Sequence, residues 1–256
     1  MLYPAPLFFN RHNKYETSIL LPLRNVVLLH GITLPVVAGK QRSVAAVDSA
    51  MLTETKQLIV TAIRPEARQR IEGLETSQQT PEIDEAPQSK FVEVESLEEI
   101  YPVATLAVIH KMSRLPMGPI QLIIEGLERV EIVELVETSP TYKVNYKRLP
   151  AVSKQDAIAR GADEQTLEAL TQAIKSLWTE AAAINPRFPE ELLGFLIKST
   201  EPAQLAYQTS VLLEQDVTTS QAILEEENIE KLLRPILADL QKAIEVQKLQ
   251  GQILGE

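Results

Sequence analysis

The chain has 256 residues, of which 45% are hydrophobic, and its formal net charge at pH 7 is -10. A chain of this length can bury a sizeable core and favours two domains over one. The negative charge repels phosphate backbones, so nucleic acid is not expected as a partner. The sequence contains no cysteine, which excludes disulfides and thiolate sites and fits a reducing compartment. No apolar run approaches the ~20 residues of a membrane span, and we expect a cytoplasmic protein without membrane contact.

The first apolar segments predict extended structure. Residues 20–29 are expected to form a buried strand that is entered through a proline. A turn is expected at His30 and Gly31, and residues 32–37 then resume an extended course. Pro35 lies inside that second stretch, and because it has no N–H to donate, it favours an edge position or a bulge. Ser43 is suited to begin a short helix, since apolar residues then recur at helical spacing.

A strongly acidic stretch interrupts this pattern. Residues 74–99 contain eight acidic residues against one lysine, together with Pro81 and Pro87. Few apolar residues are available there to anchor the chain, so we predict a solvated, mobile loop over about residues 74–96. A calcium site is the weaker interpretation, because the regular Asp spacing and the bend glycine of such loops are missing. Strands are predicted on either side of this stretch, at 58–63 and 103–109.

The central ribbon, residues 115–136, has the clearest strand signal in the chain. Ile120, Leu122 and Ile124 alternate with polar residues, as expected for a strand with one packed face. Gly126 breaks this parity, and the alternation resumes beyond it. The pattern predicts two strand segments joined by a glycine bulge or tight bend, which is a common way of turning a sheet into a closed barrel. A last strand is predicted over 142–147, before the strand signals stop near Pro150.

Beyond Pro150 the apolar period changes from two residues to about 3.6, which predicts a helical half. The helix that begins at Ser153 is expected to continue as one apolar stripe to Asn185. Further helix starts are predicted at Pro189, Pro202, Thr218 and Asn228. The final helix is expected to kink or restart at Pro235 and reaches nearly to residue 256 without a convincing stop.

The search for catalytic patterns gives negative results. Gly39-Lys40 is the only Gly-Lys pair, but Leu34 stands where a phosphate-binding loop needs its first glycine. His12, His30 and His110 lack the spacing of a zinc site, and we expect each to be structural. No Gly-x-Ser-x-Gly elbow is present. We therefore expect no catalytic residue, no metal and no cofactor in this chain.

Four short segments carry a resemblance to a known family. They are LPLRN at 21–25, LP at 34–35, GKQRS at 39–43 and EGLER at 125–129. Together they resemble the N-terminal domain of Lon proteases, and the resemblance extends over about residues 20–254. It implies an α+β fold with a PUA-like mixed β-barrel and a separate α-helical bundle that ends in a long helix. The expected organisation is a lead-in at 1–19, the barrel at 20–150 and the bundle at 151–256.

The resemblance also implies a function. Such a domain is the substrate-recognition and hexamer-organising N-terminal region of an ATP-dependent serine protease, and it binds unfolded or degron-bearing proteins. The ATPase and Ser-Lys peptidase modules that it implies are not in this chain, so ATP and Mg would belong to the parent protease alone. The alternative is a stand-alone relative that acts as a protein- or ligand-binding module, with RNA binding less expected. The unfinished final helix favours a piece of a longer protease.

Promiscuous recognition needs accessible aliphatic or methionine side chains. Our candidates lie near two turns and at a helix start, and they are Leu29, Ile32, Leu34, Lys40, Arg42, Met112, Leu115 and Met117. The competing interpretation is that the apolar members are core, as apolar residues near strand ends usually are. Lys40 and Arg42 are suited to steer acidic substrates, although the start of a solvated helix explains them equally well.

Overall fold

A computed structural model describes residues 15–77, 94–114, 119–185 and 188–254. In these residues the first half of the chain contains the strands β1 (Glu16–Leu23), β2 (Thr33–Ala38), β3 (Gln57–Ala62), β4 (Val103–Arg114), β5 (Ile120–Glu137) and β6 (Tyr142–Arg148). Two helices and one 3-10 turn accompany these strands, namely α1 (Gln41–Met51), α2 (Pro65–Ser77) and η1 (Leu97–Glu99). The second half is helical, with α3 (Lys154–Ala159), α4 (Glu164–Ile184), α5 (Glu190–Lys198), α6 (Pro202–Leu212), α7 (Val217–Glu225) and α8 (Ile229–Leu254).

The strands close into a barrel. The sheet order is β2-β5-β4-β3-β1-β6, and β5 also pairs with β6, which completes a ring of five strands. β1 and β3 are parallel, whereas the other pairs are antiparallel. β2 pairs only with the first part of β5, at residues 120–125, so it forms an edge. Pro35 lies on this edge strand, as its missing N–H predicted.

Gly126 marks the bulge that the broken parity predicted. β5 is one continuous strand, but Leu127 has no counterpart on β4 where the register shifts. A side chain at residue 126 would collide with the carbonyl oxygen of Leu29. The backbone N–H of Gly126 donates to the carbonyl of Ile32 (3.0 Å), and its carbonyl accepts from the N–H of Gly31 (2.7 Å). The missing Cβ therefore allows the segment after β1 to pack directly on the bulge.

The predicted strand at residues 20–29 was wrong in part. β1 begins at Glu16 and ends at Leu23, so residues 24–29 are not a strand, although Val27, Leu28 and Leu29 are buried. They are apolar because they pass between the sheet and the helices, and burial alone does not distinguish such a segment from a strand. The His30–Gly31 turn is confirmed, with Gly31 at φ +69.

Helix α2 occupies the start of the predicted acidic loop. It continues to Ser77, so residues 74–77 are helical, and residues 78–93 lie outside the described part. The chain is packed again at Val94, whose carbonyl accepts a hydrogen bond from the Tyr142 hydroxyl (2.9 Å). α2 carries many charged residues and little apolar periodicity, which explains why the sequence pattern did not predict it.

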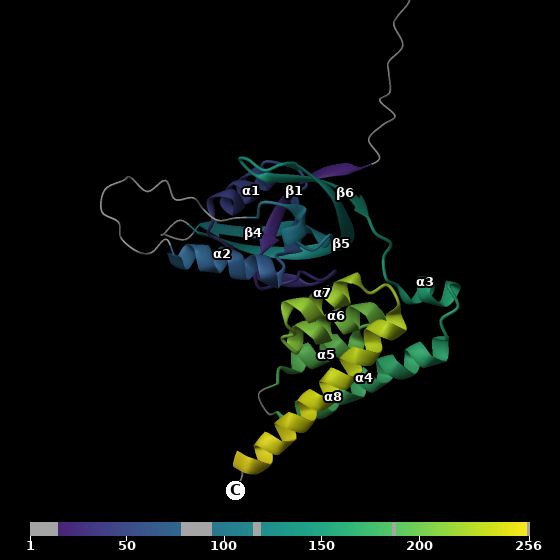
Figure 1. Cartoon of the computed structure of the whole chain (residues 1–256). Helices are drawn as coiled ribbons and strands as arrows, with labels where there is room; N and C mark the ends of the chain where they lie inside the picture. The colour runs from purple at the N-terminus through teal and green to yellow at the C-terminus, as the bar shows by residue number, and fades with distance from the viewer. Residues whose placement is uncertain (1–14, 78–93, 115–118, 186–187, 255–256) are drawn as a thin grey trace, which may run out of the picture.

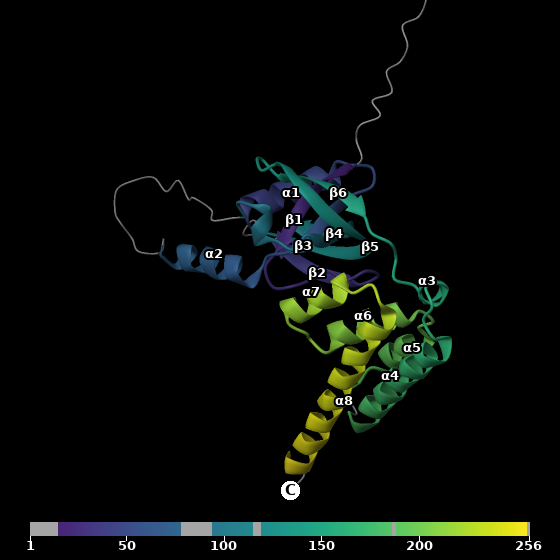
Figure 2. The same cartoon turned by 45° about the vertical axis from the view of Figure 1, so that its right-hand side comes forward.

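The helical half differs from the prediction at one point, and at Pro235 one of the two predicted alternatives, a restart, is excluded. Gly161 adopts φ +97 and separates α3 from α4, where one continuous helix was expected. Asp163 is the N-cap of α4, and its Oδ2 accepts a hydrogen bond from the backbone N–H of Thr166 (2.9 Å). α8 passes through Pro235 as one helix, so no restart occurs there. Both views show α8 running away from the barrel beyond the other helices (Figures 1 and 2).

Three apolar clusters hold the described chain together. Two of them fill the barrel and its surroundings, around Leu20 and Ile59 in one case and Leu58 and Leu122 in the other. The third cluster contains most of the helical core and also Leu29 from the barrel half. Figure 2 shows α6 and α7 directly against the barrel, where this shared cluster lies. The strands end at Arg148 and α3 begins at Lys154, and two domains that meet near Pro150 remain a prediction.

Candidate functional site

Within the described ranges, no group of three or more His, Cys, Asp and Glu side chains could hold a metal ion. His110 pairs with Glu125 at 2.5 Å on the barrel surface, and burial lowers the pKa of His30. His12 lies outside the described residues. No described helix is long and apolar enough to cross a membrane.

The most distinctive surface lies around the linker, residues 149–153, which joins β6 to α3. Two open clefts flank it, with volumes of about 510 Å³ and about 480 Å³, and Ala151, Val152 and Ser153 line both. Their other walls come from helices and loops that are far apart in the sequence. The packing of the linker against these segments therefore creates both clefts.

The smaller cleft, which we call the apolar cleft, lies between the linker, the turn at His30, α5 and α6. Val152, Phe195, Ala203 and Tyr207 supply much of its lining. Phe195 is 59% exposed, although its neighbour Leu196 is completely buried. α5 carries apolar residues around more of its circumference than one packed face can cover, and Phe195 is left in the cleft wall.

Two polar side chains in this cleft are buried without partners. Tyr207 is 1% exposed and Gln208 is 7% exposed, and both line the apolar cleft. Among the described residues, neither the Tyr207 hydroxyl nor the Gln208 Oε1 has a hydrogen-bond partner. Burial raises the pKa of Tyr207, so its hydroxyl keeps its proton and can donate it. Buried polar groups are normally paired, so these two atoms are exceptions within the residues that line the cleft.

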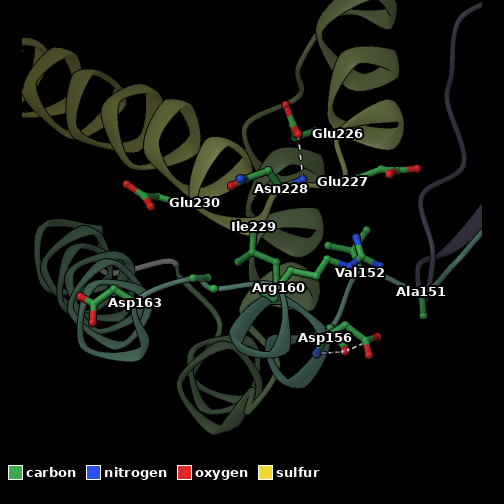
Figure 3. A pocket seen from close by; sticks show the side chains of 14 residues that line it. Ala151, Val152, Asp156, Arg160, Asp163, Glu226, Glu227, Asn228, Ile229 and Glu230 are labelled. Atoms are coloured by element: carbon green, nitrogen blue, oxygen red, sulfur yellow. Dashed lines mark hydrogen bonds between the residues drawn. The ribbon is translucent and has the colours of Figure 1, made fainter.

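The larger cleft, which we call the acidic cleft, lies between α3, the start of α4 and the junction of α7 with α8. Five carboxylates and one guanidinium line it, from Asp156, Asp163, Glu226, Glu227, Glu230 and Arg160 (Figure 3). Hydrogen bonds from Thr166 lower the pKa of Asp163, which keeps this carboxylate ionised near neutral pH. The cleft therefore presents a net negative charge.

Arg129 fixes the wall between the barrel and the acidic cleft. Its side chain is 3% exposed, and its Nη2 donates to the carbonyl of Glu225 (3.2 Å) and lies 3.8 Å from Oε1 of Glu227. Two further bonds join the halves, from Gln221 to the carbonyl of Val103 (2.9 Å) and from Gln204 to that of Gly31 (3.1 Å). Hydrogen bonds as well as apolar contacts therefore join the two halves near the clefts.

The candidate residues that the sequence indicated differ in how far they are buried. Leu29 is 1% exposed and Ile32 is 8% exposed, and both belong to the cluster between the sheet and the helices. The prediction that they form accessible substrate surface is therefore wrong, because the helices cover the turn that carries them. Leu34 and Met112 are half-buried against the barrel cluster.

The remaining candidates do not form a common surface. Lys40 is half-buried beside α1. Arg42 donates from Nη1 to the Tyr142 hydroxyl (3.0 Å) and lies 5.3 Å from the centre of that ring, so its contact is internal. Leu115 and Met117 lie outside the described residues. None of the described candidates lines either cleft beside the linker.

Phe195 and Tyr207 were missed by the sequence reasoning. The run of apolar residues around α5 was a usable signal for Phe195, because it exceeds one helical face. Tyr207 had no such signal, since α6 is buried on nearly all sides and shows little apolar periodicity. The sequence alone could not assign either residue to a cleft, because the cleft forms only where the linker packs beside α5 and α6.

The barrel, the bundle and the clefts at their junction define the class of the protein, an α+β binding module. A model of the family described as the ATP-dependent protease La (LON) substrate-binding domain matches residues 17–242, and the chain belongs to that family. The resemblance that the sequence motifs indicated is therefore confirmed.

Curated relatives support the same assignment. Lon protease 1 of Herpetosiphon aurantiacus is 29% identical over 241 residues, which cover 93% of this chain and 26% of that protein. Lon protease of Koribacter versatilis is 28% identical over 242 residues, covering 94% of this chain and 26% of that protein. The chain thus spans about a quarter of the length of the curated relatives it matches.

Solved structures show the fold. The N-terminal domain of Mycobacterium avium complex Lon protease has a TM-score of 0.60 and 17% identity, covering 88% of this chain and 98% of that one. The Lon N-terminal domain protein of Xanthomonas campestris has a TM-score of 0.54 and 15% identity, covering 87% and 98%. The predicted fold class, an α+β barrel followed by helices, is confirmed by these structures and by the strand and helix order.

Proposed function

We propose that this chain is the substrate-recognition and hexamer-organising N-terminal region of an ATP-dependent Lon protease, and that it binds unfolded or degron-bearing proteins. Membership of the substrate-binding-domain family supports this proposal, as do relatives that are named Lon protease. The structural observation that carries it is the apolar cleft, in whose wall Phe195 remains 59% exposed.

The physical basis is the exposure of apolar surface in non-native proteins. An unfolded segment presents apolar side chains together with free backbone N–H and C=O groups, which a folded protein pairs internally. A single such contact is weak, and we expect a Kd between about 1 μM and about 1 mM, or roughly -8 to -4 kcal/mol. Repetition of the cleft around a ring would convert weak contacts into useful avidity.

ATP hydrolysis and peptide cleavage would take place in other parts of the parent protease. This chain would contribute no catalytic residue and hold no cofactor, and ATP, Mg and the Ser-Lys peptidase would act outside it. Self-association into a hexamer and a cytoplasmic location belong to the same proposal. Membranes and nucleic acids are not among its partners, in keeping with the net charge of -10.

An NMR titration without nucleotide tests the proposal. A reduced and alkylated, permanently unfolded protein should bind the isotope-labelled chain in the stated range, whereas its native form should not. Phe195→Ser should weaken binding because it removes apolar surface from the cleft. Val37→Ser is the matched control, since Val37 is 61% exposed on β2 and lines neither cleft. Equal binding of native and unfolded forms, or none up to about 1 mM, would reject substrate recognition by this chain.

A further inference from the structure

We propose that the two clefts bind one extended segment together, with its apolar side chains in the apolar cleft and its lysine or arginine residues in the acidic cleft. The substrate class is therefore a non-native segment in which an apolar cluster lies next to basic residues. This inference rests on the proposed function and specifies which unfolded segments the chain prefers.

The linker makes one occupant of both clefts possible. Ala151, Val152 and Ser153 line the apolar cleft on one side and the acidic cleft on the other. A strand-like segment advances about 3.3 Å per residue, so a few residues are enough to cross this short stretch of chain. Figure 3 shows Ala151 and Val152 at one side of the acidic cleft, with Glu226 and Glu227 above them.

Charge complementarity decides what the acidic cleft accepts. Five carboxylates and one guanidinium line it, and two of the carboxylates pair with arginines outside the lining, Glu227 with Arg129 (3.8 Å) and Glu230 with Arg234 (2.5 Å). The cleft remains net negative, as does the chain as a whole. Asp163 and Asp156 are held by hydrogen bonds at helix starts, with Asp163 accepting from Thr166 and Asp156 from Ser153. These bonds keep both carboxylates ordered, so a lysine or arginine gains attraction without the cost of ordering its partners.

The apolar cleft contributes no charge preference of its own. Its walls carry one lysine, Lys198, and one glutamate, Glu201, which offset each other. Selection there comes from apolar contact, since the Tyr207 hydroxyl and the Gln208 Oε1, which are unpaired in the described part of the chain, have almost no accessible surface.

A set of three peptides tests the charge preference. The peptides share one Leu-Phe-Val core and differ only in the flank, which is Lys-Lys-Arg, Ser-Gly-Ser or Asp-Glu-Asp. Fluorescence anisotropy should give the tightest binding for the basic flank and the weakest for the acidic one, with about threefold to tenfold between basic and neutral, as for two partly screened charge contacts. This difference should shrink from ~0.1 M to ~1 M salt, where the screening length falls from about 10 Å to about 3 Å.

A matched pair of variants locates the effect. Asp163→Asn with Glu230→Gln removes two charges from the acidic cleft, and asparagine keeps the N-cap of α4. Glu54→Gln with Glu245→Gln removes the same charge from exposed positions outside both clefts. Only the first pair should abolish the advantage of the basic flank, and it should leave the neutral peptide unaffected. An equal effect of both pairs would show that the preference arises from net charge and not from the cleft.

The outcomes separate this inference from the proposed function. If all three peptides and an unfolded protein bind alike, and Phe195→Ser weakens them, the chain recognises unfolded segments but the charge preference is wrong. If no peptide and no unfolded protein binds, the proposed function itself is rejected. Unfolding midpoints of each variant, measured alongside, show whether the fold is intact.

Discussion

The barrel and helix α6 differ in how their buried hydroxyl groups are paired. In the barrel half, Thr105 donates to the carbonyl of Leu28 (2.5 Å) and Thr61 to that of Tyr101 (2.8 Å). In α6, which faces the barrel, the Tyr207 hydroxyl, the Gln208 Oε1 and the Ser210 hydroxyl lack partners among the described residues. Within the described part of the chain, unpaired buried atoms also occur in the barrel half, at Arg68 Nε and at Arg129 Nε and Nη1, so the contrast concerns the hydroxyl groups: those of Thr61 and Thr105 are used by the fold, whereas those of Tyr207 and Ser210 are not. Proteins retain such groups at functional places more often than elsewhere.

The largest expected effect concerns the packing of the barrel. Gly126→Ala should destabilise the protein by about 3 kcal/mol or more, because its methyl group would collide with the Leu29 carbonyl and lie 2.9 Å from Cγ2 of Thr105. Urea unfolding followed by circular dichroism measures the loss. Gly194→Ala is the control, since a Cβ there meets nothing within 4 Å, and it should stabilise α5 by up to about 1 kcal/mol. Similar destabilisation by both changes would contradict the close approach at the bulge.

The second prediction compares two hydroxyl groups directly. Thr105→Val should cost about 1–3 kcal/mol, because it leaves the buried Leu28 carbonyl without its donor. Tyr207→Phe should change stability by less than about 1 kcal/mol, since its hydroxyl has no partner to leave behind among the described residues. Chemical unfolding of the two variants in parallel gives the comparison. A large loss for Tyr207→Phe would show that the hydroxyl is structural, and the comparison of the two regions would fail.

A third prediction addresses the domain boundary. A chain that ends at Pro150 should still unfold cooperatively, because about 150 residues can bury a core and two apolar clusters lie within the barrel half. It should be less stable than the whole chain, since Leu29 and Ile32 would lose the helices that cover them. Calorimetry and binding of a hydrophobic dye measure both effects. A broad, non-cooperative transition would show that the helices complete the barrel core.

The smallest expected effect is a pH dependence at the turn between the two regions. Burial lowers the pKa of His30 in the folded state, so the unfolded chain binds this proton more readily. Stability should therefore be unaffected at pH values above the usual histidine pKa and should fall as the pH drops below it. His30→Asn should flatten this dependence between pH 7.5 and 5. An unchanged slope in the variant would assign the pH dependence to other groups.

Local sequence signals predicted much of the fold but little of the site. Gly126 and Pro35 broke the strand pattern at places where the structure has a bulge and an edge, because backbone chemistry acts within a few residues. Leu29 was predicted to be accessible but is buried, because the apolar pattern of a sequence does not distinguish a strand from a loop that other elements cover. Phe195 and Tyr207 join Val152 in one cleft only through the packing of the two halves, which no local pattern encodes.

Mapping of peptide contacts on the labelled chain tests the central claim most directly. We expect titration with the Leu-Phe-Val peptide that carries the basic flank to shift the amide signals of Val152, Phe195 and Gln208 in the apolar cleft and of Asp163 and Glu230 in the acidic cleft. The amides of Val37 and Val136, which line neither cleft, should not move. Shifts confined to the barrel surface, or to one cleft alone, would contradict a single segment bound across the linker.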